Sequence, residues 1–156
     1  MATKGKVPSV SSYISEKNIV FYPSSPSKRQ VLGNLIGTLD LPDPSAAIRA
    51  ILVREEMGST IIAPGLALPH ARLDGLTKIE AAIGICASGV HDPHDGGDPI
   101  RVFVVFLGPA DNMKEHLLFL SSVSSLFQRE GFLEQLCKLA TPQGVLHAMH
   151  EVEKLG

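Results

Sequence analysis

The sequence has no excess of charge of either sign and no long hydrophobic run. Its 156 residues carry 14 lysine and arginine side chains against 16 aspartate and glutamate side chains, a formal net charge of −2. Domains that bind nucleic acids or anionic membrane surfaces carry a clear excess of positive charge, so the composition argues against both classes. The longest strongly apolar run extends only from Val102 to Leu107, whereas a membrane-spanning helix needs about 20 such residues.

The N-terminal residues lack the apolar segment of a secretory signal, and cysteine is scarce throughout. Cys86 and Cys137 are the only two cysteines, and both lie in apolar stretches. This pattern favours two buried thiols in a reducing compartment, although two cysteines can also pair in a disulfide. We therefore expect a soluble cytoplasmic protein that does not insert directly into a membrane.

Length and composition are those of one globular domain. The chain is 44% hydrophobic and 19% charged, which argues against disorder, and its length can bury a core without disulfides or a structural metal. Residues 1–12 are rich in lysine, serine and proline, so we expect a flexible N-terminus there. Residues 13–156 then form the single domain.

Two amphipathic helices are predicted in the first third of the chain. Apolar residues recur at helical spacing over 28–40, and Ser27 is placed to cap the first turn. Pro44 follows a helix-breaking segment and is suited to the first turn of a second helix, which we expect to run through Met57. Gly58 then ends it.

The rest of the chain predicts strands followed by helices. Residues 59–69 suggest short strands or an extended loop. The segments 80–87 and 101–107 are predicted strands, and both are too apolar to have one face fully exposed to solvent. The composition of 89–99 predicts an exposed loop, and the pattern from 112 to the end is helical. The fold class is therefore α/β, with helices packed on a small mixed sheet.

One histidine has an unusual setting. His70 follows Pro69, which stiffens the backbone, and precedes Ala71, whose small side chain leaves room for a bulky group to approach. An imidazole held in this way suits nucleophilic or acid–base chemistry. The alternative is a histidine at a strand end that hydrogen-bonds a backbone carbonyl.

Several segments together resemble a known signature. The runs 54–60 (Arg-Glu-Glu-Met-Gly-Ser-Thr) and 65–70 (Gly-Leu-Ala-Leu-Pro-His) are similar to those of phosphotransferase-system (PTS) enzyme IIA domains of the fructose/mannitol class. That class includes stand-alone nitrogen-regulatory members. The resemblance continues through 98–100 (Asp-Pro-Ile) and the helix that opens at 115–120, and covers roughly residues 12–154.

The resemblance implies a function and a site. By it, His70 accepts a phosphoryl group from the phosphocarrier protein HPr, and Arg54 and His116 are its partners in the site; no cofactor and no metal is implied. The chemistry agrees with these residue types, because phosphoryl transfer depends on positioning and on stabilising negative charge. A guanidinium presents a fork of donors to phosphate oxygens, and a histidine near a helix start can donate an N–H.

The sequence departs from the family pattern just before the histidine. Members commonly have glycines where this chain has Ile61 and Ala63. Side chains at these positions would reshape the rim of the pocket if the glycines serve close approach.

Other candidates have simpler explanations. His91 and His94 lie among aspartates, but His-x-x-His lacks a third ligand, so we expect a solvated loop and no metal. Arg72 is a rival to Arg54 for the phosphate or a partner in a surface ion pair. Ser59 and Thr60 either bond near the phosphate or cap the turn after the helix.

Two functional classes follow from the resemblance. The chain is either a stand-alone, nitrogen-regulatory-like phosphocarrier that acts on regulatory target proteins, or a sugar-specific unit that passes phosphate to a separate enzyme IIB. In the first class, phosphorylation of His70 changes which proteins bind. A third possibility, a degenerate domain that is not phosphorylated, is raised by Ile61 and Ala63.

Overall fold

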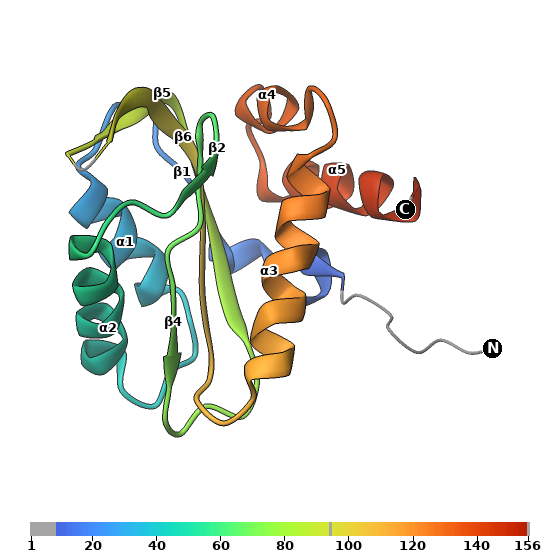
Figure 1. The fold of residues 1–156 in the computed structure, drawn as a ribbon. Coiled ribbons are helices and arrows are strands. Elements are labelled where there is room, and N and C mark those ends of the chain that lie inside the picture. Colours follow the sequence, from blue (N-terminus) through green and yellow to red (C-terminus); the bar gives the residue numbers. More distant parts are fainter. Residues whose placement is uncertain (1–8, 94, 156) are drawn as a thin grey trace.

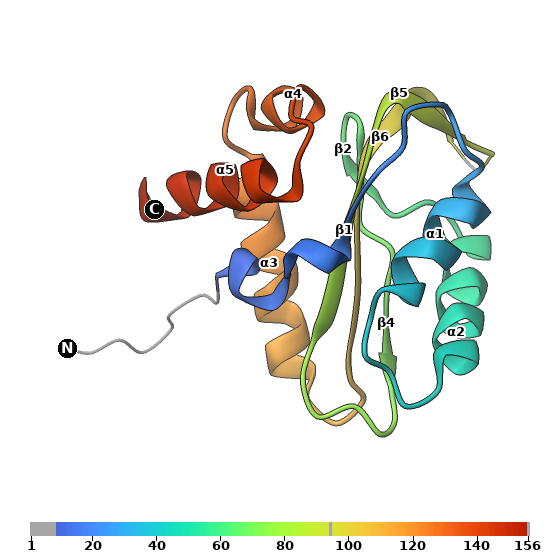
Figure 2. The same ribbon diagram turned by 180° about the vertical axis from the view of Figure 1, so that it is seen from behind.

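A computed structural model describes residues 9–93 and 95–155 as a three-layer α/β domain (Figures 1 and 2). A mixed sheet of six strands stands between helices α1 and α2 on one face and α3, α4 and α5 on the other. The elements in chain order are the 3₁₀ helices η1 (Val10–Tyr13) and η2 (Glu16–Asn18), β1 (Ile19–Phe21), α1 (Lys28–Gly37), α2 (Pro44–Glu56), β2 (Ile61–Ala63), β3 (Leu66–Ala67), β4 (His70–Leu73), β5 (Glu80–Asp92), β6 (Asp95–Pro109), α3 (Met113–Phe127), α4 (Phe132–Cys137) and α5 (Pro142–Leu155). The predicted fold class is confirmed.

The antiparallel hairpin of β5 and β6 forms the centre of the sheet. β1 pairs with β5 in parallel, and both β3 and β4 pair with β6 in parallel, at different positions along it. β2 adds an antiparallel edge next to β3. In this register His70, the first residue of β4, lies beside Phe106 of β6.

Alternate side chains of the central strands fill two separate cores. Ile83 and Phe106 face α3, α4 and α5, whereas Ala82 and Val105 face α1 and α2. Because both faces of β5 and β6 are covered, these strands are apolar at nearly every position over 81–86 and 102–107.

The two predicted N-terminal helices are confirmed. The Ser27 hydroxyl accepts a hydrogen bond from the Gln30 N–H, and the Gln30 side chain bonds back to the Ser27 N–H in a capping box. Asp43 caps α2 by accepting from the Ala46 N–H, with Pro44 as the first helical residue. Both helices end slightly before the predicted residues, at Gly37 and Glu56.

The predicted exposed loop over 89–99 is wrong, because β5 and β6 continue through most of it. Val90 pairs with Ile100, and both are buried in the core beside α1 and α2. The polar groups of this stretch bind residues far away in the sequence. The Ser25 hydroxyl donates to the Gly89 carbonyl, and Lys28 binds the buried Asp92. Of the two histidines in this stretch, His91 is exposed in β5 and His94 lies outside the described residues.

Residues 10–12, the last of the segment expected to be flexible, have a defined place in the structure. They belong to η1, where Val10 is buried against α3 and α5 and both the N–H and the hydroxyl of Ser11 donate to the Glu153 carboxylate of α5. Figure 2 shows this short helix beside α3 and α5. Residues 1–8 lie outside the described residues.

Both cysteines are free thiols. Cys86 is buried, and burial raises its pKa to about 12, whereas Cys137 is only partly buried. Cys86 belongs to the core beside α1 and α2, and Cys137 packs against the core on the other face of the sheet. Among the helices of the described residues, none has the length and apolar character to cross a membrane.

Candidate active site

His70 stands at the start of β4 and is held on one face by an aromatic ring. Its imidazole stacks on Phe106 of β6, with ring centroids 5.2 Å apart and an angle of 8° between the planes. The His70 side chain is partly exposed, so a group outside the fold can reach it. This contact fixes the plane of the imidazole without covering the whole ring.

A backbone hydrogen bond fixes which nitrogen of His70 carries the proton. His70 Nδ1 lies 2.6 Å from the Leu68 carbonyl oxygen. A carbonyl only accepts, so Nδ1 is the donor, and in the neutral ring the lone pair stands on Nε2. The predicted alternative of a histidine bonded to a backbone carbonyl is thus present, and this bond does not use the Nε2 lone pair. Pro69, buried between the two residues, stiffens this turn.

The structure brings His116 to His70, as the resemblance implied. His116 lies in the first turns of α3, and its ring centroid is 5.3 Å from that of His70 and 4.9 Å from that of Phe106. It is only 5% exposed. Burial, and then electrostatic interactions with His70 and with the Arg72 guanidinium, lower its pKa to about 4, so the His116 ring is neutral near pH 7.

The backbone of β6 makes room for the His116 ring. A Cβ at Gly108 would lie 3.1 Å from His116 Nδ1, and this buried nitrogen has no hydrogen-bond partner among the described residues. A neutral ring that holds its proton on Nε2 avoids burying an unpaired N–H at Nδ1. The geometry therefore favours Nε2–H as the donor of His116.

Burial of His116 makes the stability of the fold pH-dependent. Its pKa falls from 6.5 in the unfolded chain to about 4 in the fold, so its stabilising contribution is complete above pH 6.5 and is lost as the pH falls towards 4. This contribution is about 3 kcal/mol at most. We expect the free energy of unfolding, measured with urea from about pH 7 down to pH 4, to fall less in His116→Gln than in the wild type. His147→Gln, an exposed control on α5, should keep the wild-type pH dependence, and an unchanged dependence in His116→Gln would contradict a buried neutral ring.

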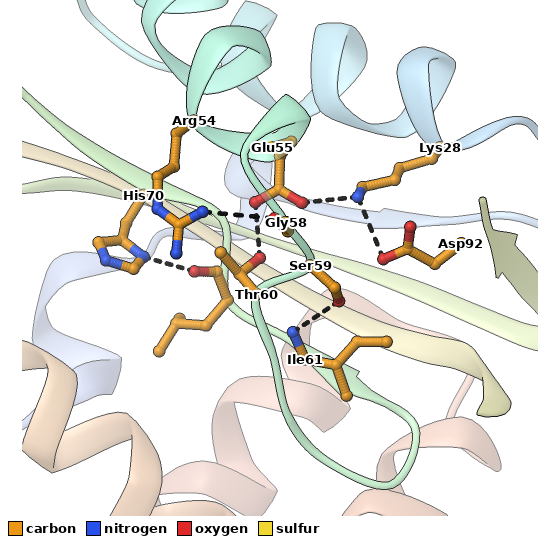
Figure 3. A network of polar contacts seen from close by, with 10 residues as sticks. Lys28, Arg54, Glu55, Gly58, Ser59, Thr60, Ile61, His70 and Asp92 are labelled. Carbon is orange, nitrogen blue, oxygen red and sulfur yellow. Dashed lines mark hydrogen bonds and ion pairs between the residues drawn. The ribbon is translucent and has the colours of Figure 1, made fainter. Parts of the chain in front are cut away.

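Arg54 reaches the site from the end of α2, which packs against β4. Its Nη1 donates to the Gly58 carbonyl oxygen at 3.3 Å, and the side chain is partly buried. Figure 3 shows Arg54 with this contact to Gly58. The packing of α2 on β4 therefore brings the end of the helix that carries Arg54 to the strand that begins at His70.

Arg72 is the second cation near the site. It follows His70 by two residues in β4, so both side chains stand on the same face of the sheet. Its side chain is exposed, Nη1 donates to the Ala110 carbonyl oxygen at 3.2 Å, and its charge contributes to the lowered pKa of His116. The structure thus keeps Arg72 close to the pair of histidines without burying it.

Ser59 and Thr60 both take part in the turn that follows α2. The Ser59 hydroxyl accepts from the Ile61 N–H at 3.1 Å, and the Thr60 hydroxyl donates to Glu55 Oε2 at 2.7 Å. Ile61 and Ala63, which replace glycines of the family pattern, form β2 and pack against opposite cores. In the part of the chain that the structure describes, no group of three or more histidine, cysteine, aspartate or glutamate side chains could hold a metal ion.

Comparison with known proteins gives this arrangement a family. The model of the family described as "Phosphoenolpyruvate-dependent sugar phosphotransferase system, EIIA 2" matches residues 12–152. The chain belongs to this family. The EIIA 2 match extends from η1 into α5 and includes the three residues of the candidate site, Arg54, His70 and His116.

Relatives of this EIIA 2 chain have two kinds of name. The PTS system fructose-specific EIIA component of Haloferax volcanii is 30% identical over 110 residues, which are 70% of this chain and 71% of that protein. The Nitrogen regulatory protein of Pseudomonas aeruginosa is 28% identical over 88% of this chain and 91% of its own length. The crystal structure of Nitrogen Regulatory Protein IIA-Ntr from Neisseria meningitidis matches 90% of this chain and 98% of its own, with a TM-score of 0.81 at 22% identity. At that identity, this structural match shows the fold alone.

Proposed function

We propose that this EIIA 2 chain is a phosphoryl carrier that takes its phosphoryl group from HPr on Nε2 of His70. The observation that carries the proposal is the hydrogen bond from His70 Nδ1 to the Leu68 carbonyl, which leaves the Nε2 lone pair as the nucleophile. In the step, Nε2 forms a bond to phosphorus while the bond between phosphorus and HPr breaks. The Nδ1 proton stays on the ring, and the Leu68 carbonyl stabilises the positive charge that develops there.

The neighbours of His70 are suited to the charge of the transferred group. The transition state spreads negative charge over the equatorial oxygens of the phosphoryl group, and donors fixed in advance stabilise it. Arg54 offers a planar fork of N–H donors, and the neutral His116 offers Nε2–H. The exposed Arg72 adds a positive charge at the rim.

The surface around the site supports transfer between proteins. Five exposed apolar side chains lie on or directly after the elements next to the site: Val53, Met57, Ile62, Met113 and Leu117. We propose that HPr, and then the acceptor, docks on this face. The two free thiols support the cytoplasmic location that we propose for the exchange.

We propose that the carrier is of the nitrogen-regulatory type, with regulatory proteins as its targets. The similarity to the P. aeruginosa Nitrogen regulatory protein over nearly the full length of both chains supports this assignment. The similarity to the H. volcanii fructose-specific component favours a second candidate, transfer to a separate enzyme IIB. Incubation of the labelled carrier with a purified fructose-class enzyme IIB separates them, because only a sugar-specific unit should lose its label rapidly.

Labelling of the wild-type chain tests the proposal. Phospho-HPr prepared from radiolabelled phosphoenolpyruvate should transfer label to the protein, and the product should be acid-labile and base-stable, as a phosphoramidate is. A chain that takes no label from phospho-HPr would overturn the proposal and would indicate a degenerate binding domain.

The two arginines should differ in their contributions to transfer. Arg54→Lys keeps the positive charge but loses the planar fork, so we expect the rate of transfer from phospho-HPr to fall by at least about tenfold. Arg72→Lys, the matched control, should change the rate much less, because the exposed Arg72 acts as a point charge at the rim. The rates are measured by rapid quench at equal protein concentrations. A damaging Arg72→Lys beside a silent Arg54→Lys would show that the phosphate sits elsewhere.

A further inference from the structure

A buried network of charged side chains lies behind the candidate site (Figure 3). Lys28 Nζ is 2.6 Å from Glu55 Oε1 and 3.2 Å from Asp92 Oδ2. Glu55 and Asp92 are 4% and 3% exposed. The network joins the start of α1, the end of α2 and the end of β5. Because the ammonium lies between two buried carboxylates, Glu55 is held in one position.

The other oxygen of Glu55 holds the segment that leads from α2 to β2. Glu55 Oε2 accepts from the Thr60 hydroxyl at 2.7 Å, and the two residues are five apart in the chain. The hydrogen bond closes residues 55–60 into a turn. Inside this turn, the Gly58 carbonyl accepts from Arg54 Nη1. The bond between Glu55 and Thr60 therefore restrains the carbonyl that orients the Arg54 guanidinium.

A second path leads from the same bond to His70. The Thr60 carbonyl accepts from the Leu68 N–H at 2.9 Å. The Leu68 carbonyl in turn accepts from His70 Nδ1 at 2.6 Å. One residue, Leu68, thus connects Thr60 to the hydrogen bond that sets the tautomer and the orientation of His70.

We propose that Thr60 and Glu55 are positioning residues that set Arg54 and His70 relative to each other. Neither would contact the phosphoryl group, and both hydrogen-bond paths start at their bond, which Lys28 and Asp92 fix from behind. A displacement of about 1 Å in a reacting group can lower the rate by a factor of about 100. A turn that fixes the positions of two such groups therefore has a large effect on the rate of phosphoryl transfer. The inference rests on the proposed function for the reaction, but its structural part, the state of the His70 ring, does not.

Thr60→Val tests the inference because it removes the hydroxyl and nearly keeps the shape of the side chain. We expect the maximal rate of transfer from phospho-HPr to fall by about tenfold or more, with little change in the phospho-HPr concentration at half-saturation. The ¹⁵N NMR shifts of His70 should also move from one fixed tautomer towards an average of both. Thr60→Ser keeps the hydroxyl and should restore the rate and the shifts.

A second threonine supplies the matched control. The hydroxyl of Thr38, at the end of α1, donates to the Leu35 carbonyl at 2.8 Å, on a different turn of the chain. Thr38→Val loses this hydrogen bond and the one that the hydroxyl accepts from Asn18 Nδ2 at 3.2 Å. It should leave both the transfer rate and the His70 shifts unchanged. Circular dichroism and thermal unfolding show whether each variant is folded.

The outcomes separate this inference from the proposed function. A folded Thr60→Val with the wild-type rate and wild-type His70 shifts would overturn the positioning role. If Thr60→Val does not fold, Lys28→Gln loosens Glu55 from the other side, and the same two readouts decide. A wild-type chain that takes no label removes the proposed function, and the NMR shifts, which need no phosphoryl donor, still decide whether Thr60 positions His70.

Discussion

Replacing His70 with alanine is expected to abolish labelling by phospho-HPr. The prediction rests on the only imidazole in the site that combines partial exposure with a fixed Nδ1–H: its partner is the Leu68 carbonyl, and Phe106 holds the ring plane. His116 is buried and neutral and offers a donor rather than an exposed nucleophile. Autoradiography of the purified variant, with the wild type alongside, gives the result directly.

Two other histidines serve as controls for this experiment. His91→Ala changes an exposed residue of β5, and His94→Ala changes a residue outside the described part of the chain. Both variants should keep full labelling. Label that persists in His70→Ala would contradict the assignment, and its stability to acid would then distinguish a phosphohistidine from an ester at Ser59 or Thr60.

Replacing His116 with alanine is expected to slow transfer by about 10²–10³-fold, the range seen when one preorganised donor is removed. The ring lies 5.3 Å from His70, centroid to centroid, and burial holds it neutral, so its Nε2–H can meet a phosphoryl oxygen without first losing a shell of water. Single-turnover kinetics with phospho-HPr measure the rate, and the concentration at half-saturation should change little.

The His116 variant needs its own control, because the side chain is buried. His147→Ala on the exposed face of α5 should transfer at the wild-type rate, and circular dichroism should show that His116→Ala is folded. A folded His116→Ala with an unchanged rate would return His116 to a packing role between α3 and β6.

Much of the fold could be predicted because the sequence marks it locally. Each helix start is encoded by residues at that start: Ser27 and Gln30 form the capping box of α1, and Asp43 caps α2 in front of Pro44. The strands β1 and β4 were missed, because they have only three and four residues and exist through pairing with the distant β5 and β6. Short strands of this kind leave no periodic pattern to detect.

The wrong prediction of a loop over 89–99 also arose because long-range pairing is not visible in the local sequence. The composition of 89–99 indicates a loop, and the structure places Val90 and Ile100 opposite each other in the core. The apolar character of these two residues was the available signal, and it was outweighed by the glycines, prolines and aspartates around them. The contact that neutralises Asp92 comes from Lys28, which is 64 residues away in the chain.

Part of the candidate site could also be predicted from the sequence, and part could not. The setting of His70 between Pro69 and Ala71 predicted it as a candidate, and the family resemblance added Arg54 and His116. The Leu68 carbonyl, and the path through Thr60 to Glu55, were not predictable, because backbone carbonyls and a turn closed across five residues have no signature in side-chain spacing.

Identifying the atom that carries the phosphoryl group is the most direct test of the proposal that His70 is the phosphoryl acceptor. The protein, labelled with ¹⁵N in its histidines and phosphorylated by phospho-HPr, is measured by ³¹P and ¹⁵N NMR. The coupling between phosphorus and nitrogen should appear at Nε2 of His70, with Nδ1 still protonated and bonded to the Leu68 carbonyl. Phosphorus on Nδ1 of His70, on another histidine or on a hydroxyl would contradict it.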